Sequence, residues 1–267
     1  MLYTKIHFLN PKQVNKFKES YNDLPKNDYV DSFVIADCLR FGRINKKVYI
    51  GDYHYKALQN LTQARCFAVC NLTKKKQRFP DPDAVAKAIQ KAARSSYRLP
   101  KTVNDSVNQV LSISITSMKA LESQIKAFDK AIAAQMELLP NVLISIPGIG
   151  PVFSAEIMAE IGDIHRFDNQ AALAKYAGLA WTQHQSGNFG AQTTRLIKSS
   201  NRFLKYYLCE AAFSLVRCDK AYNAFYHLKY KEVNRYQHKR ALALTAYKFV
   251  RLVFALLKDN HLYRPAE

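Results

Sequence analysis

The segment 105–139 is the feature that most limits what this chain can fold into. Its apolar residues recur in steps of three and four, the spacing of one face of a long α-helix. They are Met118, Leu121, Ile125, Phe128, Ile132, Met136 and Leu139. A coiled coil has such a seam, and helix packing within one chain would produce the same stripe. The pattern predicts a long helix and leaves self-association open.

Shorter helical patterns occupy most of the remaining chain and predict a mainly α protein. Two short strands are expected at 1–9 and 48–50, and further helices at 12–21, 28–41, 54–75, 84–97, 152–161, 167–180, 198–216, 221–231 and 239–257. Phe79-Pro80-Asp81-Pro82 breaks the chain, and Pro140 ends the long helix. The predicted domains are therefore 1–80, a linker with the long helix at 81–140, and a helical domain at 141–267.

Two glycines define a turn near the start of the third predicted domain. Ile146-Pro147-Gly148-Ile149-Gly150 is typical of a helix-hairpin-helix, in which backbone N–H groups beside Gly148 and Gly150 bind a phosphate. An ordinary helix connection is the alternative, and Glu156, Glu160 and Asp163 nearby would repel a nucleic-acid backbone.

The charge of the chain favours a polyanionic partner. The formal net charge is +19 in 267 residues, and the basic excess lies in 1–80 and 191–267. Such clustering is typical of nucleic-acid binding, with a solvated basic surface as the alternative. The basic residues expected to contact a phosphate backbone are Arg195, Lys198, Arg202, Lys205, Lys239 and Arg240.

Two features suggest chemistry on that partner. Ser186 lies in the polar, glycine-bracketed loop 184–190 before the basic segment, where it could attack a phosphate; an ordinary loop serine is the alternative. Asp28 and Asp31 share one face of a predicted helix. Two such carboxylates can hold a divalent metal ion, or they can complement the helix dipole.

The sequence argues against export and against a disulfide framework. No sustained apolar segment opens the chain, and the apolar stretch 241–257 is interrupted by Lys248 and Arg251. The five cysteines are an odd number and are scattered. These features predict a soluble protein of the cytoplasm, without membrane contact.

Several motifs resemble, in order and spacing, the C-terminal domain of the IS110-type insertion-sequence transposases. These are Ile146–Gly150, Phe167–Gln170 with Ala177-Gly178, Gln185-Ser186-Gly187, Asn201–Lys205, and the closing segments 239–243 and 254–257. Asn10-Pro11, 26–32 and 35–37 are similar to the end of the DEDD domain of the same family.

The resemblance implies a DNA recombinase in the prokaryotic cytosol, associated with the nucleoid. In that family an α/β RuvC-like (RNase H-like) DEDD domain binds Mg²⁺, a coiled coil helps to assemble an oligomer, and a serine in an all-α C-terminal domain forms a phosphoserine link to DNA. A structured guide RNA selects the site. Ser186 matches the nucleophile, and Asp28 and Asp31 match the last two acidic positions of DEDD.

Two departures from the family pattern shape the expectation. The first Asp and the Glu of DEDD would lie before residue 1, and Ser200 stands where the family usually has glycine. We therefore expect a truncated transposase. Two hypotheses stay open: an RNA-guided recombinase acting through Ser186, and a non-catalytic remnant that binds DNA or RNA.

Overall fold

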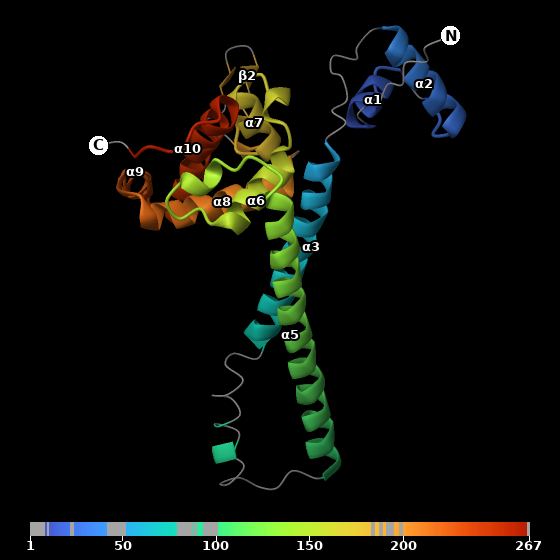
Figure 1. The fold of residues 1–267 in the computed structure, drawn as a ribbon. Coiled ribbons are helices and arrows are strands. Elements are labelled where there is room, and N and C mark those ends of the chain that lie inside the picture. Colours follow the sequence, from blue (N-terminus) through green and yellow to red (C-terminus); the bar gives the residue numbers. More distant parts are fainter. Residues whose placement is uncertain are drawn as a thin grey trace. The chain divides into compact units, whose positions relative to one another are not determined.

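The protein is mainly α-helical, as the sequence predicted, and its helices form two compact units, Met1–Ile50 and Gly51–Glu267 (Figure 1). The computed structural model describes residues 9, 11–21, 24–41, 52–78, 87, 90–92, 101–182, 185–186, 189–190, 195–197 and 200–265. The strand expected at 48–50, and all but one residue of the strand expected at 1–9, lie outside these ranges.

The first unit is a helical pair, α1 (Pro11–Lys18) and α2 (Asp28–Arg40). Pro11 opens α1, where its missing N–H costs no hydrogen bond. Asn27 caps α2, its side-chain oxygen accepting a hydrogen bond from the Val30 N–H at 2.8 Å. Val34 is fully buried against α1. Both helices agree with the sequence prediction.

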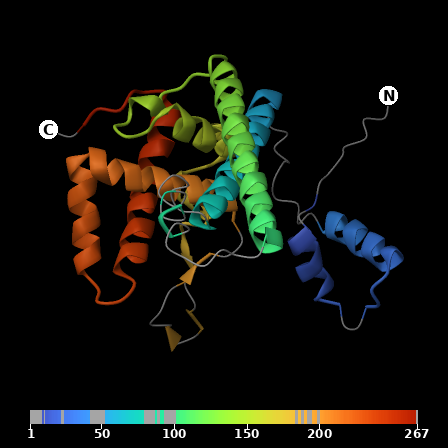
Figure 2. The same ribbon diagram turned by 90° about the horizontal axis from the view of Figure 1, so that it is seen from below.

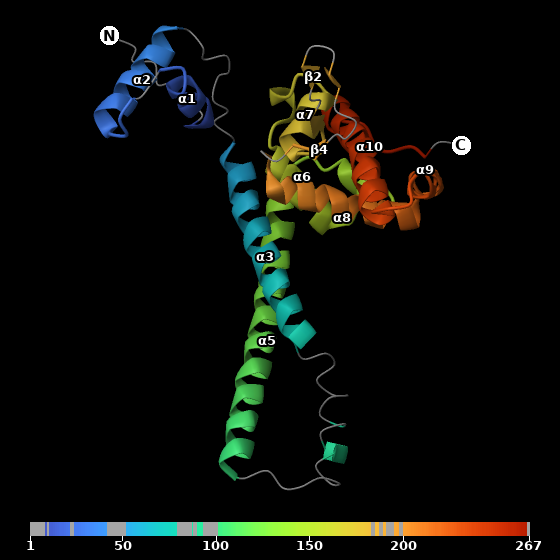
Figure 3. The same ribbon diagram turned by 180° about the vertical axis from the view of Figure 1, so that it is seen from behind.

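The second unit contains the long predicted helix, α5 (Lys101–Met136), which packs along α3 (Tyr53–Arg78). Figures 1 and 3 show the two crossing lengthwise. The N-terminal half of α5 leaves Val107, Val110 and Ile113 exposed. The helix is confirmed, whereas its use as a coiled coil between chains stays a prediction. The helix expected at 84–97 is described only at residues 87 and 90–92, which are helical.

The core of the second unit is built around α6 (Pro151–Ile161), in which every residue from Ser154 to Ile161 is buried. Helices α3 and α8 (Arg202–Cys218) contact α6, while α10 (Gln237–Asp259) packs on α8, on α7 (Gln170–Ala177) and on α9 (Lys220–Lys231). A 3-10 turn, η2 (Ile164–Arg166), links α6 to α7. Fully buried side chains include Leu143, Ile157, Leu173, Leu208 and Phe249.

The glycine turn before α6 differs from the expected helix-hairpin-helix in its first element. That element is a three-residue 3-10 helix, η1 (Leu143–Ser145). Gly148 has a φ of +81°, which favours glycine, and its carbonyl accepts a hydrogen bond from the Ser214 hydroxyl at 2.8 Å. Gly150 caps α6, and Pro151 is the first residue of that helix.

Four two-residue strands lie between α7 and α8: β1 (Trp181–Thr182), β2 (Gln185–Ser186), β3 (Phe189–Gly190) and β4 (Arg195–Leu196). β1 pairs with β4 and β2 pairs with β3, both antiparallel. The sequence predicted a loop here, so these ladders were missed; two-residue strands are too short to show an alternating pattern.

The boundary between the two compact units follows Ile50 in the sequence, so α3 belongs to the second unit, although the predicted boundary at residue 80 grouped it with the first domain. The three predicted domains stay a prediction about the modules of the family. None of the described helices is both long and apolar enough to cross a membrane.

Candidate serine hairpin and its buried polar support

Ser186 lies in the β2–β3 strand pair, which forms the serine hairpin, and the β1–β4 pair flanks this hairpin in the sequence. In the β2–β3 pair Ser186 is opposite Phe189, and Gln185 is opposite Gly190. In the β1–β4 pair Trp181 is opposite Leu196, and the Ile197 N–H extends the ladder by donating to the Ala180 carbonyl at 3.0 Å. The structure thus describes the backbone of Ser186, while its side chain lies outside the described part.

The base of the hairpin is attached to the helical core on both sides. On the β1 side, the Trp181 ring meets the Tyr247 ring of α10 edge to face, with centroids 5.7 Å apart. After β4, the Asn201 N–H donates to the Tyr176 carbonyl of α7 at 2.9 Å. The chain therefore enters and leaves the serine hairpin at fixed points.

Asn201 connects this exit point to α8 and to the centre of the core. Its side-chain oxygen accepts from the N–H groups of Phe203 and Leu204, both at 3.0 Å, which caps α8. Its side-chain Nδ2 donates to Glu160 Oε2 at 2.6 Å and to the Tyr176 hydroxyl at 3.3 Å. One side chain thus uses both its acceptor and its donor.

Glu160 is a buried carboxylate held by amides. Only 2% of the residue is exposed, and within the described ranges it forms no ion pair. Besides Asn201, it accepts from Gln59 Nε2 at 2.8 Å and from Gln63 Nε2 at 2.6 Å, both on α3. These hydrogen bonds offset the cost of burying a charge. Glu160 thereby joins α3, α6 and the start of α8.

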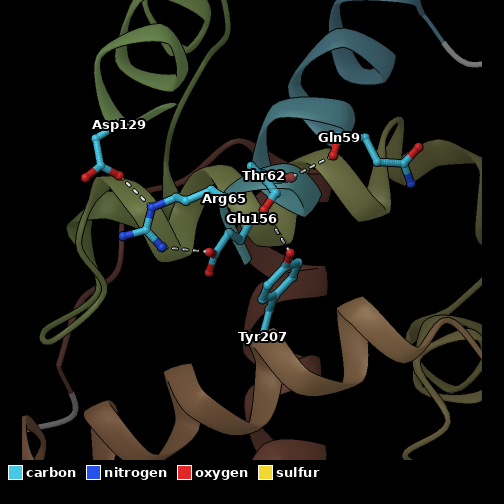
Figure 4. A network of polar contacts seen from close by, with 6 residues as sticks. All are labelled: Gln59, Thr62, Arg65, Asp129, Glu156 and Tyr207. Atoms are coloured by element: carbon cyan, nitrogen blue, oxygen red, sulfur yellow. Dashed lines mark hydrogen bonds and ion pairs between the residues drawn. The ribbon is translucent and has the colours of Figure 1, made fainter. Parts of the chain in front are cut away.

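A second polar cluster lies one helical turn earlier on α6 (Figure 4). Arg65 of α3 donates from Nε to Asp129 of α5 at 2.5 Å and from Nη1 to Glu156 of α6 at 3.3 Å. Burial raises the pKa of Glu156 to about 7, against the opposing effect of Arg65. Tyr207 of α8 donates to the Thr62 carbonyl at 3.3 Å, and burial raises the pKa of this phenol.

Both clusters were missed from the sequence, although a signal was present. Glu156 and Glu160 interrupt an otherwise apolar helix, and buried carboxylates need partners. Glu156 and Glu160 are both buried and bonded to residues of α3, and their effect on a nucleic-acid backbone stays a prediction.

The predicted basic contacts are placed unevenly. Arg202 is exposed in the first turn of α8, with its guanidinium over the Phe203 ring, and Lys205 is half-buried. Arg195 is described only as backbone in β4, and Lys198 lies outside the described residues. Lys239 is exposed. Arg240 forms an ion pair with Glu232 at 2.9 Å.

The two glycines of the predicted phosphate site have different surroundings. A side chain at Gly148 would meet Cys218 Sγ at 2.8 Å, whereas open space surrounds Gly150. Both residues are exposed. Their role in phosphate binding stays a prediction.

The two predicted metal ligands do not form a metal site on their own. Asp28 is exposed at the start of α2, and Asp31 is paired with Lys18 at 2.6 Å. Within the described residues, no group of three or more His, Cys, Asp or Glu could hold a metal ion. Mg²⁺ therefore needs further ligands besides these two carboxylates, one of which is paired with an ammonium group.

Comparison with known protein families finds a family match for two segments of the chain. Residues 141–227 match the model described as "Transposase IS116/IS110/IS902 family". Residues 3–81 match a second model, the DEDD transposase of IS110 elements. The chain belongs to the IS110 family of transposases. The sequence resemblance is therefore confirmed.

This chain has individual relatives that agree with the family assignment. It is 30% identical over 200 residues to the 44.8 kDa protein of insertion element IS116 from Streptomyces clavuligerus, covering 72% of this chain and 47% of that one. It is 28% identical over 211 residues to the 43.6 kDa protein of IS110 from Streptomyces coelicolor, covering 70% and 51%. The transposase of IS1111A from Coxiella burnetii is 32% identical over 136 residues, covering 51% and 37%. The chain spans about half the length of the first two relatives.

The buried clusters connect the two matched segments. Gln59, Gln63 and Arg65 belong to the segment matched by the DEDD model, while Glu156, Glu160 and Asn201 belong to the other. Helix α3 therefore supports the domain that carries Ser186, and the Glu160 contacts reach the exit of its hairpin.

Proposed function

We propose that this chain is part of a DNA transposase in which Ser186 is the nucleophile. The observation that carries the proposal is the match of two transposase models, with Ser186 inside the segment 141–227 matched by the IS116/IS110/IS902 model. In the proposed step the Ser186 hydroxyl oxygen forms a bond to a DNA phosphorus. The bond from that phosphorus to a deoxyribose oxygen breaks, and the serine proton passes through solvent to the departing oxygen.

The anchoring of the hairpin supports this role. A serine hydroxyl is a weak nucleophile, so catalysis depends on orientation and on charge placed around the phosphate. The β1–β4 pair, the Trp181–Tyr247 contact and the Asn201–Glu160 bond hold both ends of the hairpin. The proposed phosphate contacts are Arg195, Lys198, Arg202 and Lys205, with Lys239 and Arg240 contacting the DNA backbone farther away.

The remaining family properties extend the proposal to the assembled enzyme. We propose a RuvC-like DEDD domain, a coiled coil through α5 that joins copies, a phosphate contact at the Gly148–Gly150 turn, and a structured guide RNA that selects the DNA. Mg²⁺ would neutralise charge on the transferring phosphate. Asp28 and Asp31 would supply part of its ligands, and the ion pair of Asp31 with Lys18 means that they do not bind it alone.

A covalent-capture assay tests the proposal. The chain is incubated with Mg²⁺, nicked DNA carrying its gene with both flanks, and RNA transcribed from those flanks, and then run on a denaturing gel. The proposal expects a protein–DNA adduct with the parent chain and none with Ser186→Ala. The matched control is Ser145→Ala, which removes a serine of η1 from the same domain and should retain the adduct. An adduct that persists in Ser186→Ala contradicts the proposal.

A second candidate function is nucleic-acid binding without catalysis. The observation that favours it is that Asp31, one of the two expected metal ligands, is neutralised by Lys18. It predicts salt-sensitive binding of DNA or RNA and no adduct in the same assay. Affinity that is unchanged between 50 and 200 mM salt, values chosen for the test, contradicts both candidates.

A further inference from the structure

The turn between α9 and α10 carries an exposed aromatic side chain on a strained backbone. Figure 2 shows the two helices side by side, joined at one end by residues 232–236. Tyr236 is 80% exposed and has a φ of +53°. A left-handed conformation costs a tyrosine about 1 kcal/mol or more, and such strain is concentrated at functional sites. A large side chain in this position therefore requires a reason.

The backbone of this turn is held by contacts that do not involve the tyrosine ring. Glu232 forms ion pairs with Lys229 at 2.5 Å and with Arg240 at 2.9 Å, and Arg240 also donates to the Lys229 carbonyl. Beside it, the Tyr226 hydroxyl and His238 Nδ1 share a hydrogen bond of 2.7 Å. These bonds join the end of α9 to the start of α10, so Tyr236 projects from a rigid base.

Positive charge that has no ion-pair partner in the described part of the chain lies on both sides of Tyr236 in the sequence. Lys231, Arg235 and Lys239 are all exposed, and none of them forms an ion pair within the described residues. The acidic residue of the turn, Glu232, is already bonded to Lys229 and Arg240. Three free cations and one ring thus lie within nine residues of sequence.

This combination fits single-stranded nucleic acid. Cations follow the phosphate backbone of an unpaired strand, and aromatic rings stack on its exposed bases. A duplex hides its base faces, and an acidic peptide offers no flat partner for the ring. We propose that the turn, defined by Lys231, Arg235, Tyr236 and Lys239, binds an unpaired strand of DNA or RNA, with Tyr236 stacked on one base. The inference rests on the proposed nucleic-acid function and adds a site beyond the segment 141–227 matched by the family model.

Binding of short labelled strands tests the proposal. The probes are a 15-nucleotide thymidine strand, the matching uridine strand, a 15-base-pair duplex and heparin, all chosen for the test, with full-length protein. We expect Tyr236→Ala to weaken binding of at least one single strand about tenfold, Tyr236→Phe to restore it, and binding of heparin to stay unchanged. The thymidine and uridine arms distinguish DNA from RNA. Tyr53→Ala, which removes an exposed tyrosine of α3, is the matched control and should bind as the parent does.

Two further measurements separate stacking from charge and from folding. The fluorescence of 2-aminopurine at the centre of a strand should be quenched by the parent and by Tyr236→Phe but not by Tyr236→Ala. Arg235→Ala should lower the slope of log affinity against log salt by about 0.7, as expected for one lost contact to a single strand. Tyr236→Asn tolerates the positive φ, so its melting temperature should equal or exceed that of the parent while strand binding falls.

The outcomes distinguish failure of this inference from failure of the proposed function. If the parent binds strands and Tyr236→Ala binds them equally well, the site at the turn is wrong and nucleic-acid binding stands. Equal losses for duplex, heparin and single strand also overturn base stacking. If the parent binds none of the nucleic-acid probes, the proposed function itself fails.

Discussion

Asn201→Asp is the substitution that best tests whether the buried Glu160 contacts support the serine hairpin. As a helix cap, aspartate is as good as asparagine and also favours the helix dipole. Judged from α8 alone, the change should be neutral or stabilising. The structure predicts the opposite, because the Asn201 amide donates to Glu160 Oε2 at 2.6 Å. Aspartate has no donor at that position and faces a buried carboxylate.

The expected cost follows from that contact. A hydrogen bond to a charged group contributes about 1.5–3 kcal/mol, and two carboxylates in contact add repulsion. We expect Asn201→Asp to lower the free energy of unfolding by about 3 kcal/mol at pH 8.

Urea unfolding measured by circular dichroism and by tryptophan fluorescence checks this value. The chain has one tryptophan, Trp181, at the base of the hairpin, so its emission reports on that region. Asn169→Asp is the matched control: Asn169 caps α7 by accepting from the Ala172 N–H, and it is exposed. Adding Glu160→Gln to Asn201→Asp should recover part of the loss. If Asn201→Asp is as stable as Asn169→Asp, the reasoning is refuted.

Two further predictions concern stability. The folded-state pKa of Glu156 lies above its ordinary value of 4.5, at about 7, so its neutral form contributes stability that is complete below pH 4.5 and is lost as the pH rises through 7. Unfolding free energies from pH 5 to 8 should therefore fall by about 3 kcal/mol more in the parent than in Glu156→Gln, and parallel curves would contradict this. Gly148→Ala puts an alanine at a φ of +81° and places its methyl group 2.8 Å from Cys218 Sγ. Chemical denaturation should therefore show that the free energy of unfolding falls by about 3 kcal/mol. Gly150→Ala should cost about 1 kcal/mol or less, and equal losses for the two glycines would refute the steric argument.

Local patterns predicted most of the helices. The apolar spacing of 105–139 and the helix break at Pro140 act within a few residues, so the sequence shows them directly. The short strands around Ser186 depend on pairing with residues farther along the chain, and no pattern in two residues predicts that. The predicted first helix of the hairpin became the 3-10 turn η1 for a similar reason, since only a short segment separates Pro140 from Gly148.

The sequence predicted which residues of the candidate site carry reactive or charged groups, but it did not predict the buried contacts that hold the site in place. Ser186 and the basic residues can be recognised by residue type and order. The structural role of Glu160, in contrast, depends on hydrogen bonds from Gln59 and Gln63, which lie 101 and 97 residues earlier in the sequence. Such contacts follow from tertiary packing. The same limit applies to Arg240, which was predicted to contact a phosphate backbone and whose ion pair with Glu232 the sequence did not show.

Locating the covalent bond tests the central claim most directly. The adduct captured with DNA, Mg²⁺ and flank-derived RNA is digested with nuclease and protease, and the peptides are sequenced by tandem mass spectrometry. The account predicts a nucleotide attached through phosphate to Ser186 in the parent chain. A nucleotide on any other residue, with Ser186 unmodified, would contradict it.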